Sequence, residues 1–562
     1  MQSSQSDQTV AQVYLQLLAS RGIEYLFGNA GTDFPPLIEA YAKAQESGIS
    51  VPQPILVPHE NIAIGMAYGF AMVTGRMQAV MVHVGVGTAN SICGLFNASR
   101  QAIPIFMTAG RTPWTEKGIE GGRNNYINWA QEMFDQAGMV RESVKWDFEL
   151  KHPSQLETVV DRAMAIARSE PPGPIYLVLP REVLAATMTE QVSKITTLAP
   201  SVAAHPPPDV ISQIGELLKN AKRPVLITSD AGRVHKAWDA LTRFAEKHEV
   251  PVVQYRPRFA SISTSHPLHA GYDPAPYLRE ADLVLITECD VPWIPDQVQP
   301  RADAKVVQWG SDPLFENYPL RGFRSDITLA ASTVATLEAL IALPASSLIS
   351  ARHDWVDKMR QPALVKPTAD QGMTSAWVSY CIGQASDEKT VILNEYSLAL
   401  EHLQFTKPGN YFSHSPAGGL GWATGAALGA RLARPDATVI ACVGDGTYMF
   451  GNPTPFHFVS RAQSLPVLTV VFNNRRWGAV HRATLAMYPQ GDASQMKEPP
   501  FSTLEPSPDY EKIVEACGGY GEKVEDAAQL PSALERALHA LRVRGLPAVL
   551  NVITEINYKR TS

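Results

Sequence analysis

Apolar runs that lack polar alternation recur along the whole chain, and stretches with helical spacing follow them. Residues 439–443 and 467–472 are the clearest pair of such runs. Each run has the length of one buried strand, and the interval between them leaves room for a crossover helix. The pattern predicts parallel strands that alternate with helices, which is the arrangement of an α/β fold.

The same alternation is organised in three blocks. Apolar runs of the first block lie at 79–84, 105–108 and 175–178, and those of the middle block lie at 225–228, 252–253, 283–286 and 306–307. Two polar stretches that contain prolines, 187–209 and 344–371, separate the blocks and are predicted to be linkers. We therefore expect three domains, at residues 1–186, 209–343 and 372–562.

Glycine and polar residues follow both strands of the last block. They are Gly444-Asp445-Gly446-Thr447 and Asn473-Asn474. Ligands of open α/β sheets bind beyond the carboxyl ends of the strands, so Asp445 and Asn474 are expected to lie close together. Magnesium takes carboxylate and amide oxygens and completes its shell with phosphate oxygens and water. Asp-Gly and Asn-Asn are also common turn pairs, so each half alone has a simpler explanation.

At this separation the two motifs resemble the cofactor signature of thiamine diphosphate enzymes, a GDG triplet followed by an NN pair. The resemblance implies that Mg²⁺ is bound by Asp445, by the side chain of Asn474 and by the main-chain oxygen of Arg476. It places Gly446 and Thr447 against the diphosphate. It also implies the fold of that family, three doubly wound α/β domains with mainly parallel sheets, which are the pyrimidine-binding, central and diphosphate-binding domains.

A glutamate precedes a helix of small residues near the start of the chain. His59-Glu60 is followed by residues 61–71, which resemble the segment that carries the catalytic glutamate of the family. There the carboxylate hydrogen-bonds the aminopyrimidine ring, so that the ring can remove the thiazolium proton. Glu60 is the candidate for this role. The alternative is an acid in a first helical turn, where the helix dipole favours negative charge.

A glycine-rich segment before a second small-residue helix resembles the part of the family that bends the cofactor. Residues 415–422 make up this segment. The resemblance implies that Leu420 is the apolar wedge under the ring and that the carbonyl of Gly418 accepts a hydrogen bond from the amino group. Upstream, an apolar run at 391–393 predicts a strand whose end places Ser397 on the diphosphate. Simple tight packing is the alternative for the glycines.

Residues 27–37 and 82–90 resemble benzoylformate decarboxylase. In that enzyme a serine and a histidine stand where this chain has Thr32 and His83. The resemblance implies that Thr32 hydrogen-bonds a substrate carboxylate and that His83 transfers a proton, a task suited to imidazole with its pKa of about 6.5. A histidine at a strand end can also be a satisfied core residue. The second pocket histidine of that enzyme has no counterpart in residues 289–296.

Residues 129–134 instead resemble a segment of acetolactate synthases in which a glutamine lines the active site and directs carboligation. Gln131 is the corresponding residue, and an ordinary residue on a helix surface is the alternative. The flavin-contacting arginine-phenylalanine-aspartate segment of the synthases is not found in the middle block. The sequence therefore leaves bound FAD open.

These signals predict an enzyme that uses thiamine diphosphate and Mg²⁺ to decarboxylate a 2-oxo acid and to pass the enamine to an acceptor. An acetolactate synthase-like carboligase is our first expectation, and a non-ligating decarboxylase that resembles benzoylformate decarboxylase is the alternative. An inactive binding or regulatory homologue is a third, but it would be expected to have lost Glu60 or Asp445. The resemblance also implies a homodimer or homotetramer, since the family's glutamate and metal site meet across a subunit interface.

Composition agrees with a soluble globular enzyme. The chain has 562 residues, of which 45% are hydrophobic and 18% are charged, and its net charge is −7. It shows no dense run of Lys and Arg, which argues against a nucleic-acid partner. No uncharged apolar stretch reaches about 18 residues, and the first ten residues are polar, so we expect no membrane span and a cytoplasmic location. The 5 cysteines show no CxxC spacing.

Overall fold

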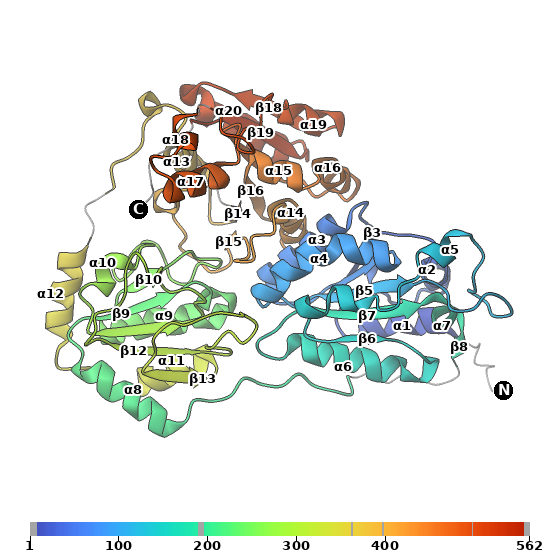
Figure 1. Cartoon of the computed structure of the whole chain (residues 1–562), viewed down its shortest axis with the longest axis horizontal. Helices are drawn as coiled ribbons and strands as arrows, with labels where there is room; N and C mark the ends of the chain where they lie inside the picture. Colours follow the sequence, from blue (N-terminus) through green and yellow to red (C-terminus); the bar gives the residue numbers. More distant parts are fainter. Residues whose placement is uncertain (1–7, 189–195, 361–363, 396–397, 497, 556–562) are drawn as a thin grey trace.

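The computed structural model describes residues 8–188, 196–360, 364–395, 398–496 and 498–555. It contains three α/β domains, each built on a parallel sheet (Figure 1). The predicted fold class, three doubly wound domains with mainly parallel sheets, is confirmed.

The N-terminal domain has the strand order β3-β2-β4-β5-β7-β6, and neighbouring strands are parallel. Helices α3 and α4 pack on one face of this sheet, and α1, α2 and α6 pack on the other. The strands are β2 (Tyr25–Gly28), β3 (Gln53–Leu56), β4 (Ala79–Val82), β5 (Phe106–Arg111), β6 (Asp147–Glu149) and β7 (Ile175–Pro180). The helices are α1 (Val10–Ser20), α2 (Pro35–Ser47), α3 (Glu60–Thr74), α4 (Val84–Arg100), α5 (Ile127–Ala130), α6 (Leu156–Arg168) and α7 (Arg181–Ala185).

The central domain has the parallel strand order β10-β9-β11-β12-β13. Its strands are β9 (Pro224–Thr228), β10 (Val252–Gln254), β11 (Leu283–Thr287), β12 (Lys305–Gly310) and β13 (Ile327–Ala330). Its helices are α8 (Pro208–Asn220), α9 (His235–His248), α10 (Ala275–Leu278), α11 (Thr333–Ala342) and α12 (Ile349–Met359). These elements share one apolar core, which is separate from the cores of the other two domains.

The C-terminal domain has the parallel strand order β15-β14-β16-β17-β19-β18. Helices α14, α16 and α19 pack on one face, and α13 and α20 pack on the other. The strands are β14 (Thr390–Glu395), β15 (Tyr411–Ser413), β16 (Thr438–Gly444), β17 (Leu468–Asn473), β18 (Tyr520–Val524) and β19 (Ala548–Ile553). The helices are α13 (Ser375–Ala385), α14 (Trp422–Ala433), α15 (Asp445–Phe450), α16 (Pro453–Ala462), α17 (Gly478–Met487), α18 (Asp492–Gln495), α19 (Tyr510–Ala516) and α20 (Leu530–Arg542).

The apolar runs singled out in the sequence all form strands of these sheets. The run at 79–84 ends two residues earlier than its pattern suggests, because His83 is the N-cap of α4. Several elements lie in the stretches predicted as linkers, including the start of α8 and a 3-10 turn at Ala369–Gln371. Strand β8 (Thr187–Met188) pairs antiparallel with β1 (Gln8–Thr9), and α12 buries Trp355 and Val356 in the core of the central domain.

Helices α3 and α14 join the N-terminal and C-terminal domains through a close backbone contact. A Cβ atom added to Gly65 would lie 2.8 Å from the Cα of Gly425, and one added to Gly69 would overlap the carbonyl oxygen of Ala426. Buried residues on both helices belong to one apolar core that extends from the N-terminal sheet to the C-terminal sheet. The two domains therefore share a single core at this contact, and glycine at these positions permits it.

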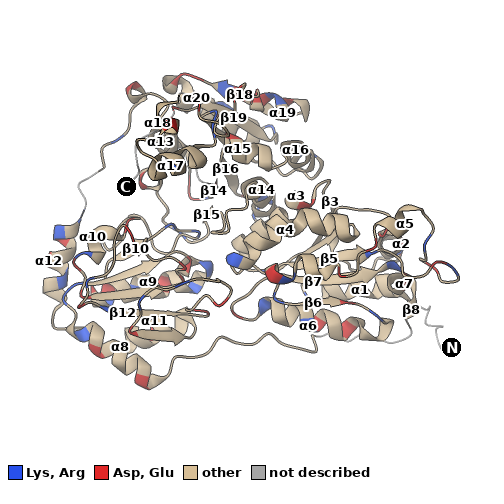
Figure 2. Ribbon diagram, viewed as in Figure 1, with Lys and Arg blue, Asp and Glu red and all other residues tan. Residues whose placement is uncertain are grey.

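Charged side chains lie mostly on the outward-facing helices and loops, while the strands carry few of them (Figure 2). Within the described ranges, no helix is both long enough and apolar enough to cross a membrane.

The variant Gly69→Ala is expected to lower the melting temperature, because its Cβ would force α3 away from Ala426. Overpacking of this kind costs about 1–3 kcal/mol, and the better helix propensity of alanine offsets about 1 kcal/mol of that cost. Gly322→Ala is the matched control, since a Cβ there meets no atom. Thermal unfolding followed by circular dichroism compares the two variants, and equal melting temperatures would contradict the packing argument.

Candidate active site

Asp445 begins α15 directly after β16, and its carboxylate is only partly satisfied. The residue is 2% exposed, and Oδ1 accepts a hydrogen bond from the N–H of Gly446 at 2.9 Å. Oδ2 is buried and has no hydrogen-bond partner among the described residues. Burial raises the pKa of Asp445 to about 6, although the N–H groups of Gly446, Arg475 and Arg476 favour its charged form. The carboxylate thus lies beside the turn that follows β17.

That turn is fixed by its first asparagine. Asn473 is 1% exposed; its Oδ1 accepts from the N–H of Arg475 at 3.1 Å, and its Nδ2 donates to Asn551 at 3.0 Å. The side-chain oxygen of Asn474 accepts from the N–H of Arg476 at 3.0 Å. Strands β16 and β17 are paired in parallel up to Gly444, so the Asp445 and Asn474 motifs follow neighbouring strand ends. This is the juxtaposition that the sequence predicted.

The residues of this region fit a magnesium ion bound to a diphosphate. They offer one carboxylate with a buried, unpartnered oxygen, one amide oxygen and a main-chain carbonyl, which are the hard oxygen donors that Mg²⁺ prefers. In the described part of the chain, no group of three His, Cys, Asp or Glu side chains could hold a metal ion instead. Thr447 is buried beside Gly446, and the ring of Trp477 lies against the Cα of Gly446.

The glycine-rich segment lies at the start of α14, as predicted. Gly418 has a φ of 71°, in the left-handed region, and Leu420 is two residues before Trp422, the first residue of the helix. The hydroxyl of Thr424 donates to the carbonyls of Gly421 and Gly451, both at 3.1 Å, which ties this segment to the end of α15. Ser397, predicted to contact the diphosphate, lies outside the described residues.

Glu60 is the first residue of α3 and is 6% exposed. Its Oε2 accepts a hydrogen bond from Nδ2 of Asn90 on α4 at 3.2 Å. A Cβ on Gly87 would lie 3.2 Å from Oε1, so the glycine makes room for the carboxylate. Two residues of α4 therefore lie next to the Glu60 carboxylate. Asn90 donates a hydrogen bond to it, and Gly87 leaves space for it.

His83 forms a pair with a carboxylate that the sequence did not single out. Its Nδ1 lies 2.6 Å from Oδ1 of Asp33, and Oδ2 of Asp33 accepts from the N–H of Val84 at 3.2 Å. Asp33 is 2% exposed, whereas His83 is only partly buried. The other ring nitrogen, Nε2, lies 3.4 Å from Nε2 of Gln131. The structure thus brings the predicted His83 and Gln131 together. Aspartate and histidine in hydrogen-bond reach are an arrangement suited to proton transfer.

Thr32 is exposed beside Asp33, and its carbonyl accepts from Nη1 of Arg181 at 3.0 Å. The same guanidinium donates to the carbonyls of Gly121 and Gly122. The next residue, Glu182, accepts from the N–H of Trp114 at 2.7 Å. The connection between β5 and β6, which carries Gln131, is therefore anchored to the end of β7. Arg181 had no signal in the sequence, because its partners are three main-chain carbonyls and Oδ1 of Asn124, which form no recognisable spacing with it.

Family models match each of the three domains. The model described as "Thiamine pyrophosphate enzyme, N-terminal TPP binding domain" matches residues 8–139, the central-domain model of the same family matches 211–340, and its "C-terminal TPP binding domain" matches 395–552. The chain belongs to the thiamine pyrophosphate enzyme family. The predicted family and the prediction of an enzyme are confirmed.

The relatives of this thiamine pyrophosphate enzyme include both of the predicted kinds. A benzoylformate decarboxylase of Pseudomonas aeruginosa is 27% identical over 97% of this chain and 99% of its own length. An acetolactate synthase large subunit of Haemophilus influenzae is 24% identical over 94% of this chain and 91% of its own.

Solved structures agree in fold. The benzoylformate decarboxylase from Polynucleobacter necessarius superposes with a TM-score of 0.82 at 21% identity, over 98% of this chain and 99% of that one. A thiamine diphosphate-dependent 4-hydroxybenzoylformate decarboxylase of Rhodococcus jostii RHA1 gives 0.81 at 23% identity, over 98% and 100%. The central domain takes part in both superpositions.

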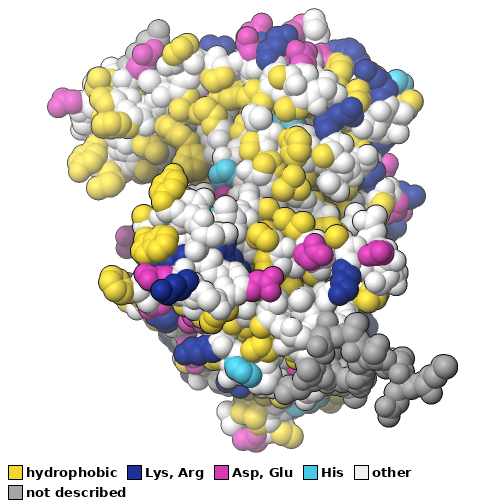
Figure 3. Space-filling view, turned by 90° about the vertical axis from the view of Figure 1, so that its right-hand side faces the viewer, with side chains coloured by type: hydrophobic (Ala, Val, Ile, Leu, Met, Phe, Trp, Pro, Cys, Tyr) yellow, Lys and Arg dark blue, Asp and Glu magenta, His cyan; other side chains and the backbone are white. Residues whose placement is uncertain are grey.

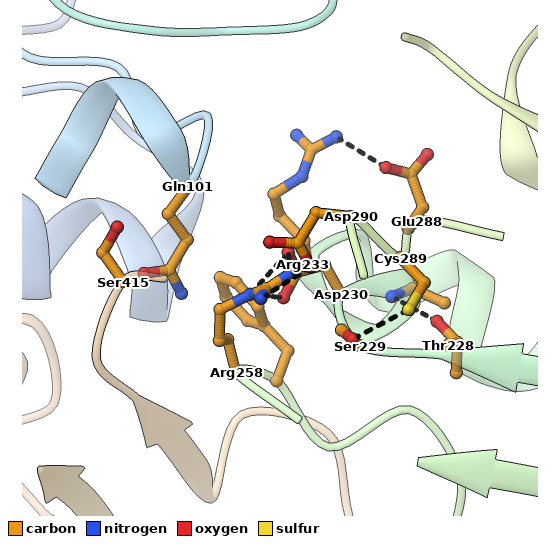
Figure 4. Close-up of polar contacts among 12 residues, drawn as sticks. Gln101, Thr228, Ser229, Asp230, Arg233, Arg258, Glu288, Cys289, Asp290 and Ser415 are labelled. Carbon is orange, nitrogen blue, oxygen red and sulfur yellow. Dashed lines mark hydrogen bonds and ion pairs between the residues drawn. The ribbon is translucent and has the colours of Figure 1, made fainter. Parts of the chain in front are cut away.

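In this thiamine pyrophosphate enzyme, an ion-pair network occupies the switch point of the central sheet (Figure 4). The strand order reverses between β9 and β11, and the crevice at such a point is where a dinucleotide would bind. Here Nε of Arg258 donates to Asp230, which follows β9, at 2.8 Å, and Nη1 donates to Asp290, which follows β11, at 3.0 Å. The carboxylates of Asp230 and Asp290 therefore lie where a diphosphate would need hydrogen-bond donors.

The backbone after β9 has no open phosphate cradle. The N–H groups of Ser229 and Asp230 donate to the carbonyl of Glu288, and that of Gly232 donates to Ser261 at 3.0 Å. A Cβ on Gly232 would overlap the carbonyl of Ala260, so this glycine accommodates the chain itself. These residues do not fit the diphosphate of FAD, the cofactor that the sequence left open, and no step is assigned to a flavin.

The variant Asp445→Asn is expected to weaken Mg²⁺-dependent cofactor binding and to change its pH dependence. The raised pKa of Asp445, about 6, means that the carboxyl is protonated below that pH, and the proton competes with the cation for the same oxygens. The affinity for Mg²⁺ should therefore fall as the pH falls through about 6. Calorimetric titration with Mg²⁺ at saturating thiamine diphosphate measures this.

Asp445→Asn also serves as the control for that titration, because the pH dependence that remains in it belongs to the cofactor's own ionisable groups. Parallel pH profiles of the two proteins would show that Asp445 does not bind the cation.

Proposed function

We propose that the protein is a 2-oxo acid decarboxylase in which His83, oriented by Asp33, transfers the proton that completes the product. The pair at 2.6 Å carries this proposal. It places an imidazole, a side chain able to donate and accept protons, in hydrogen-bond contact with a buried carboxylate that orients the ring. The relatives named benzoylformate decarboxylase support the same assignment.

The remaining residues have roles in binding and proton transfer. When bound, thiamine diphosphate with Mg²⁺ would supply the nucleophilic carbon and the electron sink that loss of carbon dioxide from a 2-oxo acid requires. Glu60 holds the proton on the ring nitrogen of the pyrimidine, and Asn90 keeps its carboxylate in place. Asp445, Asn474 and the carbonyl of Arg476 hold the cation. We assign binding of the substrate carboxylate to Thr32, which is exposed beside Asp33.

A carboligase that resembles acetolactate synthase is the second candidate, and the position of Gln131 favours it. The amide lies 3.4 Å from Nε2 of His83, so it is within reach of a group held near that imidazole. An amide there could bind the carbonyl of a second 2-oxo acid. The third possibility from the sequence, an inactive homologue, is disfavoured because Glu60 and Asp445 are both present and buried.

We further propose that the working form is a homodimer or a larger homo-oligomer. Figure 3 shows groups of hydrophobic side chains on the upper half of one face of the molecule. Large apolar residues are exposed on the segment that carries Gln131 and around α17 and α18; they include Tyr126, Trp129, Phe134, Met487, Tyr488 and Met496. A second copy that covers them is the occupant that the resemblance implies. A cytoplasmic location remains a prediction.

Product analysis tests the proposal. The purified protein is saturated with thiamine diphosphate and Mg²⁺, offered benzoylformate and pyruvate separately, and the products are identified by mass spectrometry. We expect carbon dioxide and the aldehyde of the donor acid. Asp33→Asn should slow aldehyde release about 100-fold, within the range of general acid–base catalysis. Asp239→Asn, an exposed aspartate on α9, is the control.

Acetolactate from pyruvate, formed at an unchanged rate in Asp33→Asn, would instead establish the carboligase. No carbon dioxide from either acid would contradict both candidates for these donors.

A pair of inactive variants tests both the role of Glu60 and the subunit arrangement. Glu60→Gln and Asp445→Asn should each lose nearly all turnover. If the glutamate of one subunit works with the metal site of its partner, co-expression should restore about a quarter of the activity, since half of the dimers are mixed and each mixed dimer has one intact site. Differently tagged subunits allow the mixed dimer to be isolated and assayed. An inactive mixed dimer would place Glu60 and Asp445 in one chain's site.

A further inference from the structure

Leu420, the predicted wedge, lies in a segment that is held on both sides. Before it, the side chain of Asn97 on α4 forms two hydrogen bonds with Gly419. Nδ2 donates to the carbonyl at 2.8 Å, and Oδ1 accepts from the N–H at 3.0 Å. Asn97 is 3% exposed. The amide donates and accepts at the same time, whereas a carboxylate only accepts and a hydrocarbon side chain does neither.

After Leu420, a buried carboxylate holds the backbone. Glu395, the last residue of β14, is fully buried and accepts from the N–H groups of Gly421 and Ala423, both at 2.8 Å. These N–H groups lie at the start of α14, where the helix itself offers no acceptor and where negative charge is favourable. Burial raises the pKa of Glu395 to about 8, while the N–H groups favour its charged form.

The segment has little room to shift. A Cβ on Gly419 would lie 2.7 Å from Sγ of Cys93, and one on Gly421 would lie 2.6 Å from the carbonyl oxygen of Phe450. Gly421 also has a φ of 83°, which glycine adopts at little cost. The backbone on the two sides of Leu420 is therefore fixed by α4 of the N-terminal domain and by β14 and α15 of the C-terminal domain.

Helix α4 makes a second contact of the same kind. Asn90, which donates to Glu60, lies seven residues before Asn97, or about 10.5 Å along the helix. One helix thus carries the polar partner of the predicted proton-relay glutamate and the polar partner of the wedge segment. Neither asparagine had an assigned role in the sequence.

We infer that Asn97 and Glu395 are positioning residues for the aminopyrimidine ring of the cofactor. They act through the backbone of Gly419 and Gly421, and they hold the Gly418 carbonyl and the Leu420 side chain where these groups bend the ring toward the thiazolium. The inference rests on the proposed function, because it takes Gly418 and Leu420 as the groups that contact the pyrimidine.

Asn97→Asp tests this inference with little change of shape. The variant keeps the acceptor for the Gly419 N–H but sets a carboxylate oxygen against the Gly419 carbonyl. NMR on the bound cofactor measures the rate at which the thiazolium C2 proton exchanges for deuterium. We expect this rate to fall about 100-fold, because a small misplacement of a reacting group has an effect of that size. The dissociation constant of thiamine diphosphate should rise up to about tenfold, the equivalent of one hydrogen bond.

Two controls separate positioning from general damage. Inorganic pyrophosphate with Mg²⁺ binds only the diphosphate end, so its dissociation constant should not change in Asn97→Asp. Asn220→Asp also removes a side-chain bond to a carbonyl, that of Glu216, but at an exposed helix end, and it should match wild type in all three measurements. Melting temperatures of the cofactor-free proteins monitor folding.

Glu395→Gln provides an independent variant if Asn97→Asp folds poorly. It keeps one acceptor oxygen and turns an NH₂ group toward an N–H, so C2 exchange should again slow while pyrophosphate binding is retained. Wild-type exchange rates in both variants would overturn the inference, as would equal losses of pyrophosphate and thiamine diphosphate affinity. Failure of the proposed function is distinguishable, because the wild-type protein would then bind the cofactor and exchange the C2 proton without releasing carbon dioxide and an aldehyde from either acid.

Discussion

The close contact between α3 and α14 is the constraint on which the arrangement of the molecule depends. Glycine in a helix interior costs about 1 kcal/mol relative to alanine, yet both helices place glycines where they touch. The contact merges the cores of two domains. Because α3 begins at Glu60 and α14 begins just after Leu420, the packing that stabilises the fold also fixes both helix starts. The positions of Glu60 and Leu420 therefore depend on the core between the domains.

The buried carboxylates of the molecule differ in how well their oxygens are hydrogen-bonded. Glu60 and Asp33 have side-chain partners, and Glu395 has backbone donors. Asp445 differs, because one of its oxygens is buried without a partner among the described residues. Such a group costs about 1–3 kcal/mol unless something binds it. In the proposed metal site, a cation at that oxygen would offset this cost.

The sequence predicted the parts of the fold and the site that are local. Continuous apolar runs predict buried strands, and Asp445 and Asn474 are each the first residue after such a strand. Asp33 was missed although it adjoins Thr32, since only the fold brings it to His83, 50 residues away. Asn97 and Gly419 are 322 residues apart, and Arg258 binds Asp230 and Asp290, which lie on two separate loops of the central domain. Partnerships of this kind carry no periodic or spacing signal, so they require the structure.

In the proposed function, the choice between a proton and a second carbonyl compound as acceptor would depend on one imidazole nitrogen, Nε2 of His83. With Nδ1–H donating to Asp33, neutral His83 has Nε2 free to accept from the amide of Gln131. Protonated His83 donates from Nε2, and Gln131 must then present its oxygen or move away. The proton that would end a decarboxylation and the Gln131 amide that would bind an acceptor therefore compete for Nε2 of His83. The contact between Asp33 and Nδ1 orients the ring, so in the proposed reaction the same Nε2 would face both Gln131 and the substrate, and a carboligase built on this site would have to keep that nitrogen paired with the amide.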